Sequence, residues 1–154
     1  MAFGFDGRAY VVEQADSEIV AYDHVGKPAR IASGIQGSNL VVTHDGAVYV
    51  TELPTKLTTA GRLWLVEPNR QKRLLDASVS NPTGITVSPD DEWLAVVEGK
   101  SHWGYSYRIQ ADHTIQDRER LYWFHVPDEA DDSGAQAWIV DRGGRLYAAT
   151  RMGV

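Results

Sequence analysis

The chain has 154 residues, of which 43% are hydrophobic and 23% are charged, so it is long enough and apolar enough to bury the core of one domain. Its formal net charge of −6, with 15 Lys and Arg against 21 Asp and Glu and no basic stripe, argues against nucleic acid or an anionic membrane as a partner. The absence of cysteine excludes disulfides, thiolate zinc sites and cysteine nucleophiles.

The N-terminal segment carries no visible targeting signal. It lacks the basic and apolar regions of a signal peptide, and no window of the sequence approaches the roughly 18 apolar residues of a membrane span. We therefore expect a soluble chain. Its compartment stays unknown, because a signal peptide that had already been removed would leave the same pattern.

Short apolar runs follow one another along the chain, separated by turn residues. Runs rich in β-branched and aromatic residues and bounded by Gly, Asp, Ser or Pro predict β-strands. The predicted strands cover 10–12, 19–22 and 29–31, then 40–43, 48–51, 62–66 and 73–75, then 85–88, 93–97, 104–108 and 121–125. The Asp45-Gly46 pair between two of these runs is typical of a tight hairpin turn. No amphipathic helix of useful length is predicted.

Four segments of the chain share one register. Each joins a turn to a run of apolar and aromatic residues and then to a polar residue, and they cover 6–13, 45–52, 91–98 and 143–150. Their first residues stand 39, 46 and 52 positions apart. This spacing fits the roughly 40–50 residues of a propeller blade better than the shorter helical solenoid repeats.

These repeats predict an all-β fold, a β-propeller of four-stranded antiparallel blades, with about three and a half blades in this chain. The blades would cover 2–36, 37–80, 81–134 and, incomplete, 135–154 of one partial propeller domain over 1–154. An unclosed propeller leaves a strand edge exposed. Three explanations stay open: a longer parent protein, a small ring closed by the terminal strands, or two copies that complete one another.

Three stretches of the sequence resemble a known family. They are Asn81-Pro-Thr-Gly-Ile-Thr-Val-Ser-Pro-Asp90, Ser101-His-Trp-Gly-Tyr-Ser-Tyr107 and the run from Asp131 to Thr150. Together they resemble the regucalcin, gluconolactonase and luciferin-regenerating-enzyme family of six-bladed propellers. The resemblance implies a divalent cation, usually calcium, at the mouth of the central channel, where it polarises a lactone carbonyl for attack by water.

The family's site positions can be carried over onto this sequence. Ser38-Asn39 stands where the family typically has Asn-Asp, Thr83 stands where it has Asn, and Gln136 stands where it has Asp. The resemblance therefore makes Ser38, Asn39 and Thr83 candidates for substrate binding and Gln136 the catalytic position. An amide cannot accept a proton near neutral pH, so we expect Gln136 to be inactive as a base. Calcium also prefers about 6–8 oxygen ligands that include carboxylates, which these residues do not supply.

Carboxylates recur one step past the second strand of successive repeats. Glu13, Glu52 and Glu98 share this place, and hairpin geometry puts them on the ring face opposite the Asp-Gly turns, together with the candidates named above. They are candidate metal ligands, with Asp132 of the acidic run 128–134 in reserve. The alternative is that the glutamates only end strands or pair with Lys or Arg, and that the acidic run is a solvated connection with a capped turn.

Two further residues are candidates for ligand binding. His102 follows Glu98 closely enough to reach the same rim, and Trp138 either lines the channel and stacks on a sugar ring or packs in the core. The five histidines show no metal-ligand spacing such as His-Glu-x-x-His. No Gly-x-Ser-x-Gly elbow or phosphate-cradling glycine loop occurs.

The leading hypothesis is a gluconolactonase-like propeller, a metal-assisted lactone or ester hydrolase whose activity is compromised by its substituted site. The cofactor would be Ca²⁺, or Zn²⁺ or Mn²⁺, with no cofactor as an equal alternative. The ligand would be a small neutral polyol or lactone. Two alternatives stay open: a non-catalytic propeller that binds a carbohydrate-like ligand or a protein on its channel face, and a half-ring that needs a homo-oligomer to close.

Overall fold

The computed structural model describes residues 1–56 and 58–154, and strands dominate it. Within these residues there is no α-helix, and fourteen strands form four antiparallel sheets. The prediction of an all-β propeller of about three and a half blades is confirmed, because three sheets have four strands and one has two. The described residues contain no helix long and apolar enough to cross a bilayer.

Each sheet is a meander in which consecutive strands pair with one another, and we number the sheets as blades 1 to 4. Blade 1 contains β1 (Ala2–Phe3), β2 (Ala9–Glu13), β3 (Glu18–Tyr22) and β4 (Pro28–Ser33). Blade 2 contains β5 (Gly37–Val42), β6 (Val48–Glu52), β7 (Gly61–Val66) and β8 (Lys72–Val79). Blade 3 contains β9 (Pro82–Val87), β10 (Trp93–Glu98), β11 (Trp103–Ile109) and β12 (Ile115–Trp123). Blade 4 contains β13 (Ala137–Val140) and β14 (Leu146–Ala149).

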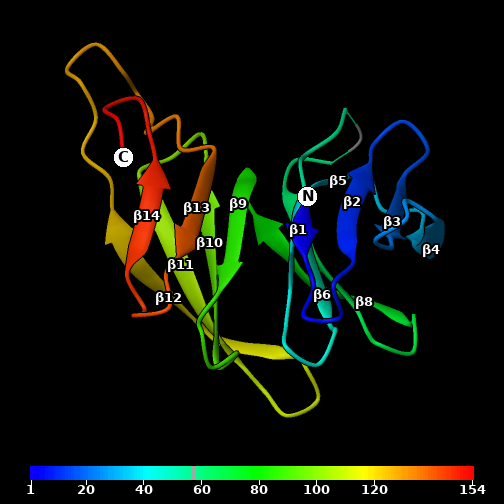
Figure 1. Ribbon diagram of the computed structural model, residues 1–154. Coiled ribbons are helices and arrows are strands. Elements are labelled where there is room, and N and C mark those ends of the chain that lie inside the picture. Colours follow the sequence, from blue (N-terminus) through cyan, green and yellow to red (C-terminus); the bar gives the residue numbers. More distant parts are fainter. Residues whose placement is uncertain (57) are drawn as a thin grey trace.

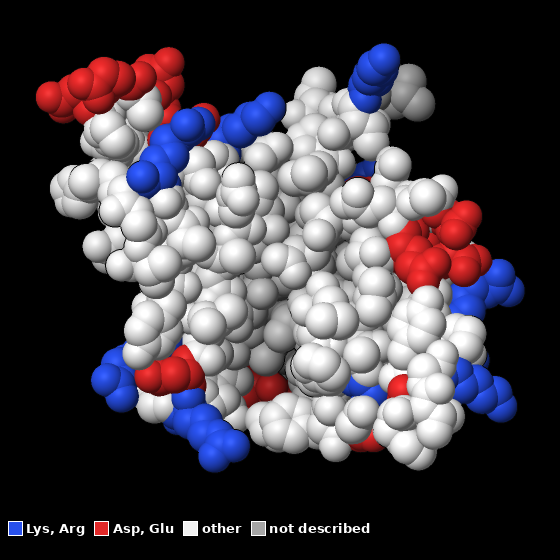
Figure 2. Space-filling view, turned by 45° about the horizontal axis from the view of Figure 1, so that its top comes forward, with Lys and Arg blue, Asp and Glu red and all other residues white. Residues whose placement is uncertain are grey.

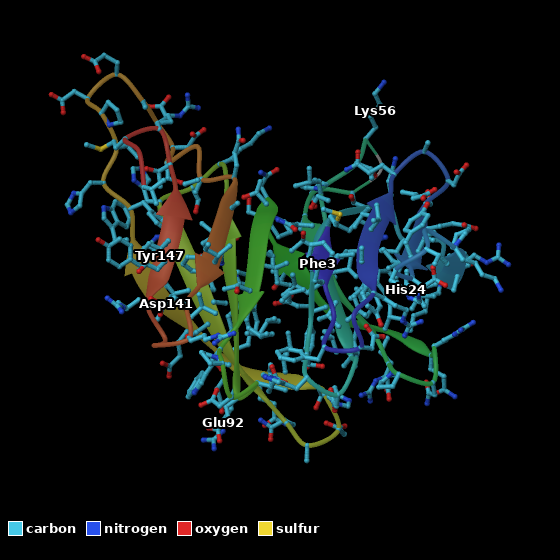
Figure 3. The ribbon with its side chains drawn as sticks, viewed as in Figure 1. Phe3, His24, Lys56, Glu92, Asp141 and Tyr147 are labelled. Carbon is cyan, nitrogen blue, oxygen red and sulfur yellow. The ribbon has the colours of Figure 1, made fainter. Side chains whose placement is uncertain are left out.

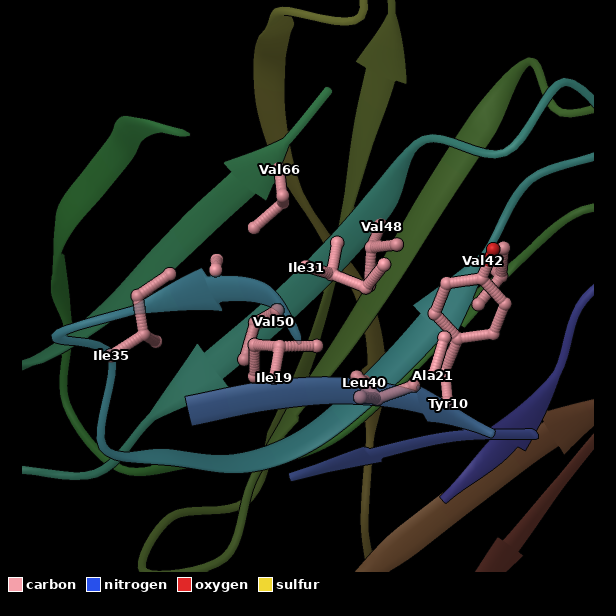
Figure 4. Packing of buried hydrophobic residues seen from close by; sticks show 11 residues of the cluster. Tyr10, Ile19, Ala21, Ile31, Ile35, Leu40, Val42, Val48, Val50 and Val66 are labelled. Carbon is pink, nitrogen blue, oxygen red and sulfur yellow. The ribbon is translucent and has the colours of Figure 1, made fainter. Parts of the chain in front are cut away.

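The hydrophobic core lies between the blades. Because side chains alternate across a strand, both faces of an inner blade bury apolar groups against a neighbour. Figure 4 shows the packing between blades 1 and 2, where Tyr10 and Ile19 of one blade meet Leu40 and Val50 of the other. A second cluster joins Tyr49 and Leu65 of blade 2 to residues of blade 3, and a third joins blades 3 and 4. The sheets are thus held face to face.

The four blades form an open arc. The first strands of successive blades lie side by side toward the centre, with β5 beside β9 and β9 beside β13, while the later strands extend outward (Figure 1). Gly84 on β9 permits this approach, since a Cβ added there would come within 2.9 Å of the Ala137 backbone. The arc leaves a free edge at β14 (Figure 1).

The outer strand of blade 3 differs from its prediction. The sequence favoured a strand over 121–125, but β12 covers Ile115–Trp123. Its centre, Gln116-Asp-Arg-Glu-Arg120, is exposed on both faces, so no alternation of apolar residues marks it. An outermost strand packs on few neighbours, and charged residues there discourage pairing with other chains.

Candidate functional site

The two ends of the strands form two different faces of the arc. The first strands begin at one face and run to the Asp-Gly type turns at the other. Lys56, on the connection after β6, marks the first face, and Glu92, in a turn, marks the second (Figure 3). We call the first the mouth face. Because antiparallel neighbours reverse direction, the ends of the second strands also lie on the mouth face, as the sequence predicted.

Two first strands carry a β-bulge where they enter the sheet. On β5, Gly37 pairs with Glu52 and Asn39 with Thr51, which leaves Ser38 as the extra residue. On β9, Pro82 pairs with Glu98 and Gly84 with Val97, which leaves Thr83 as the extra residue. Bulges often redirect a side chain beside a functional site. The structure therefore makes Ser38 and Thr83 equivalent, and the equivalent of Asn39 is Gly84.

The bulged hydroxyls bind the next blade. Ser38 Oγ lies 3.3 Å from the carbonyl oxygen of Pro82, and Thr83 Oγ1 lies 2.7 Å from that of Ala135. The amide of Gln14 donates in the same way to the carbonyl of Gly37, at 3.0 Å. Gly37, Pro82 and Ala135 occupy equivalent positions in their blades, so one kind of polar contact recurs at every blade junction of the mouth face.

The remaining inner candidates lie beside this row. Asn39 donates a hydrogen bond from Nδ2 to the carbonyl of Thr83 at 3.4 Å, and its Oδ1 accepts one from the backbone amide of Leu40 at 2.9 Å. Gln136 precedes β13, at the position of Ser38 and Thr83, and is exposed. Ser38, Thr83 and Gln136 therefore share one side of the mouth face.

Glu52 and Glu98 are buried and bound within the protein. Only 6% of Glu52 and 4% of Glu98 is exposed. Glu52 accepts from the backbone amide of Gln36 at 3.2 Å and from the indole of Trp64 at 2.8 Å. Glu98 accepts from the backbone amide of Ser80 at 2.8 Å. Each carboxylate thus fastens the connection that enters its own blade, which is a structural task.

Glu13 and Asp132 also have partners. Glu13 accepts a hydrogen bond from the hydroxyl of Tyr22, which raises the pKa of that tyrosine. The guanidinium of Arg151, 3.0 Å away, and the amide of Gly134 hold the pKa of the Asp132 carboxyl below its ordinary value. The structure does not gather these two residues with Glu52 and Glu98 into one cluster.

The two aromatic candidates are placed differently from one another. His102 stacks on Trp123 with ring centroids 4.3 Å apart and lies at the rim of blade 3. Trp138 is 3% exposed, packs between blades 3 and 4, and donates from its indole to the carbonyl of Ala95 at 3.1 Å. Of the two roles considered for Trp138, its burial supports core packing. Its side of β13 faces blade 3 and not the channel.

The metal expectation does not fit the donor atoms at the mouth face. Within residues 1–56 and 58–154, no three histidine, cysteine or acidic side chains lie close enough together to hold a metal ion. The nearby inner groups are hydroxyls and amides, which cannot balance the charge of a divalent cation. These residues therefore do not fit a divalent metal ion.

A pocket of about 570 Å³ opens on the mouth face between blades 1 and 2. Its lining consists of Gln14, Gln36, Ser38, Leu53, Pro54, Thr55 and Lys56. Among the described residues of this lining, Lys56 alone is charged. Figure 2, in which the top of Figure 1 comes forward, shows charged side chains around the periphery and a centre mostly without them.

Sequence reasoning missed Gln14 and Gln36. Gln14 directly follows Glu13, and Gln36 stands two positions before Ser38. Their positions beside residues already singled out were the available signal. Folding was needed to bring them together, because 22 positions separate them in the sequence and the hydrogen bond from Gln14 to Gly37 closes that gap.

The chain is similar to several solved structures. A gluconolactonase from Xanthomonas campestris shares 20% identity at a TM-score of 0.73, over 96% of this chain and 54% of that chain. A luciferin-regenerating enzyme shares 15% identity at a TM-score of 0.72, over 96% of this chain and 52% of that chain. Regucalcin from Agrobacterium tumefaciens, a calcium-binding protein, shares 19% identity at a TM-score of 0.71, over 97% of this chain and 52% of that chain.

These similarities confirm the resemblance at the level of the fold. The three structures are the kinds of protein that the sequence motifs resembled. The chain spans about half the length of each of them. No protein-family model matches the chain, and no curated protein matches it.

Proposed function

We propose that the mouth face binds a small neutral polyhydroxylated ligand, a polyol, a sugar or its lactone, in the pocket between blades 1 and 2. The observation that carries the proposal is the composition of the lining, which combines two amides, two hydroxyls and a lysine with two apolar residues. Such a lining matches the chemistry of a sugar, whose hydroxyls need donors and acceptors and whose C–H faces need apolar contact.

Three polar groups of the pocket have a role in this proposal. An amide side chain can both donate to and accept from a hydroxyl, and this suits Gln36. Ser38 Oγ keeps acceptor capacity beside its contacts with Thr51 and Pro82. Lys56 only donates, so it favours a ligand oxygen at the pocket's edge, including the carboxylate of an opened lactone.

Calorimetric titration with glucono-lactone, gluconate and glucose tests the proposal. We expect saturable binding of at least one of them, weakened about fivefold by Gln36→Leu, because one lost hydrogen bond is worth about 1 kcal/mol. Gln71→Leu is the matched control, since Gln71 is exposed on the turn between β7 and β8. Equal binding by both variants, or no binding of any of the three compounds, would contradict the proposal.

Lactone hydrolysis is the second candidate function, favoured by the structural similarity to a gluconolactonase. We expect the unmodified chain not to accelerate glucono-lactone hydrolysis with Ca²⁺, Zn²⁺ or Mn²⁺, because the position expected to be acidic is Gln136. Gln136→Asp, alone and with Thr83→Asn, restores a carboxylate at this exposed position. Metal-dependent hydrolysis by the unmodified chain would establish the enzyme. Hydrolysis only by the variants would show that the scaffold keeps the reaction geometry.

A further inference from the structure

Three aromatic rings form a cluster at the outer end of blade 3, on the mouth face. Trp103 begins β11 and Trp123 ends β12, and the two residues are paired across the sheet. Their rings meet edge to face with centroids 4.7 Å apart. His102 lies flat on Trp123, with ring centroids 4.3 Å apart and an angle of 7° between the planes. We call His102, Trp103 and Trp123 the aromatic rim.

Hydrogen bonds hold the aromatic rim in place. The Nδ1 atom of His102 lies 3.1 Å from the carbonyl oxygen of Phe124, and the backbone amide of Phe124 donates to the carbonyl oxygen of His102 at 2.7 Å. The backbone amide of Trp103 donates to the hydroxyl of Ser101 at 2.9 Å. A ligand that binds to rings fixed in this way does not have to order them, so binding costs less conformational entropy.

The aromatic rim lies on the side of blade 3 that faces blade 2. Alternate residues of a strand point to the same side, so Trp103 shares the side of Tyr105, which packs against the cluster between blades 2 and 3. Blade 4 lies on the opposite side, where Gly104 approaches Trp138. Blade 2 has all four of its strands, and Trp123 is still 44% exposed. A large part of this ring is therefore available to a ligand.

A guanidinium without a counter-ion borders the aromatic rim. Arg120 of β12 is exposed and lies over the ring of Trp103, 4.4 Å from its centroid. Arg118 stacks on Tyr105 in the same way, at 4.1 Å, but it also lies 3.6 Å from the carboxylate of Glu98. In the part of the chain that the structure describes, no carboxylate lies within ion-pair distance of Arg120. Arg120 is thus positioned by a ring and free to bind an anionic group.

We propose that the aromatic rim and Arg120 bind an acidic saccharide, a chain that contains uronic acid units. The C–H face of a sugar ring packs on the exposed ring of Trp123, and Arg120 binds the sugar's carboxylate through two parallel hydrogen bonds. A neutral sugar gains only the first of these contacts. The site shares no residue with the pocket between blades 1 and 2, so the proposal does not depend on that pocket.

Calorimetric titration of the whole chain with tri-galacturonate tests the proposal. The matched neutral probe is the same trisaccharide with its carboxylates reduced to alcohols. We expect saturable binding of the acidic probe and at least fivefold weaker binding of the neutral one. Added salt should weaken binding of the acidic probe, because it screens the interaction between the charges. Equal binding of the two probes, or no binding of the acidic probe, would overturn the proposal.

Two pairs of variants locate the binding. Trp123→Ala removes the exposed ring and should weaken binding of the acidic probe at least tenfold, whereas Arg120→Gln removes the charge and should make the two probes bind equally. Trp93→Ala and Arg108→Gln are the matched controls, because Trp93 is 41% exposed in the same blade and Arg108 lies over its ring at 6.0 Å. Both controls should leave binding unchanged. Equal effects of a variant and its control would contradict the proposed site.

Melting curves show whether each variant keeps its fold, and Arg120→Gln, at an exposed position, carries the test if Trp123→Ala unfolds. Gln36→Leu, in the pocket between blades 1 and 2, should leave binding of the acidic probe unchanged. Loss of binding in Gln36→Leu would place the saccharide in that pocket and overturn the site at the aromatic rim. A tri-glutamate peptide that binds as tightly as tri-galacturonate would overturn it in favour of an acidic polypeptide.

Discussion

Two buried glutamates on the mouth face stabilise the fold, although the sequence made them candidate metal ligands. Glu52 and Glu98 stand at equivalent positions, and each accepts a hydrogen bond from a backbone amide just before the first strand of its own blade. Arg62 lies 3.4 Å from Glu52 and Arg118 lies 3.6 Å from Glu98, so both carboxylates also face a guanidinium. The glutamates recur in the sequence because each binds the segment that leads into its blade.

Removal of the Glu52 carboxylate should destabilise the fold. Glu52→Leu leaves the Gln36 amide and the Trp64 indole without their acceptor inside the protein. We expect a loss of about 1.5–3 kcal/mol in the free energy of unfolding, the range for hydrogen bonds to charged groups. Urea unfolding measures it, and Glu119→Leu, at an exposed position of β12, should change stability by less than about 0.5 kcal/mol. A smaller loss for Glu52→Leu than for Glu119→Leu would contradict the structural role.

At the scale of the element, the first strands decide how closely the blades approach. β9 lies between β5 and β13, and its bulge at Thr83 and its glycine at position 84 both face a neighbouring blade. The hydroxyl of Thr83 binds the carbonyl of Ala135, and the missing side chain of Gly84 admits the backbone of β13. Polar contact and close packing are thus provided by consecutive residues.

A single methyl group at this strand should separate two blades. In Gly84→Ala the new Cβ would lie 2.8 Å from a methyl of Val97 and 2.9 Å from the Ala137 backbone, which cannot move without shifting β13. We expect a loss of about 1–3 kcal/mol, the usual cost of overpacking. Gly143→Ala is the control, because its closest contact would be 3.3 Å, to the partly exposed carboxylate of Asp141. Equal melting temperatures of the two variants would contradict the tight packing of β9 on β13.

At the scale of the whole molecule, the arc leaves apolar side chains uncovered at both ends. Phe3 is exposed at the blade 1 end, and Ile139, Tyr147 and Val154 are exposed at the blade 4 end. Phe3 and Tyr147 are visible in Figure 3, on β1 and β14. Exposed patches of this kind mark surfaces that other proteins or other parts of a protein cover.

Light scattering across micromolar concentrations tests whether these ends meet in solution. We expect a mass above the 17.1 kDa of one chain that rises with concentration and does not respond to calcium. Ile139→Lys should lower that mass without lowering the melting temperature, because its side chain is exposed. Val25→Lys, at an exposed turn position of blade 1, is the control. A constant mass of one chain at every concentration would exclude the homo-oligomer, and a calcium-dependent mass would revive the metal hypothesis.

The sequence by itself determined the architecture. Alternation of apolar residues and the turn chemistry of segments such as His44-Asp-Gly46 are local signals, so the strands and their order could be read from the chain. The outer strand β12 was misplaced because it packs on few neighbours and carries no alternation.

Only the tertiary structure decided what the side chains of the mouth face do. The burial of Glu52 and Glu98, the place of Trp138 between blades 3 and 4, and the meeting of Gln14 with Gln36 and Ser38 all depend on neighbouring blades. Strand patterns are set by residues close in sequence, whereas a side chain's partners here come from segments tens of positions away. For that reason the sequence predicted which residues lie on the mouth face. The contacts between blades then decided which of them stabilise the fold and which line the pocket.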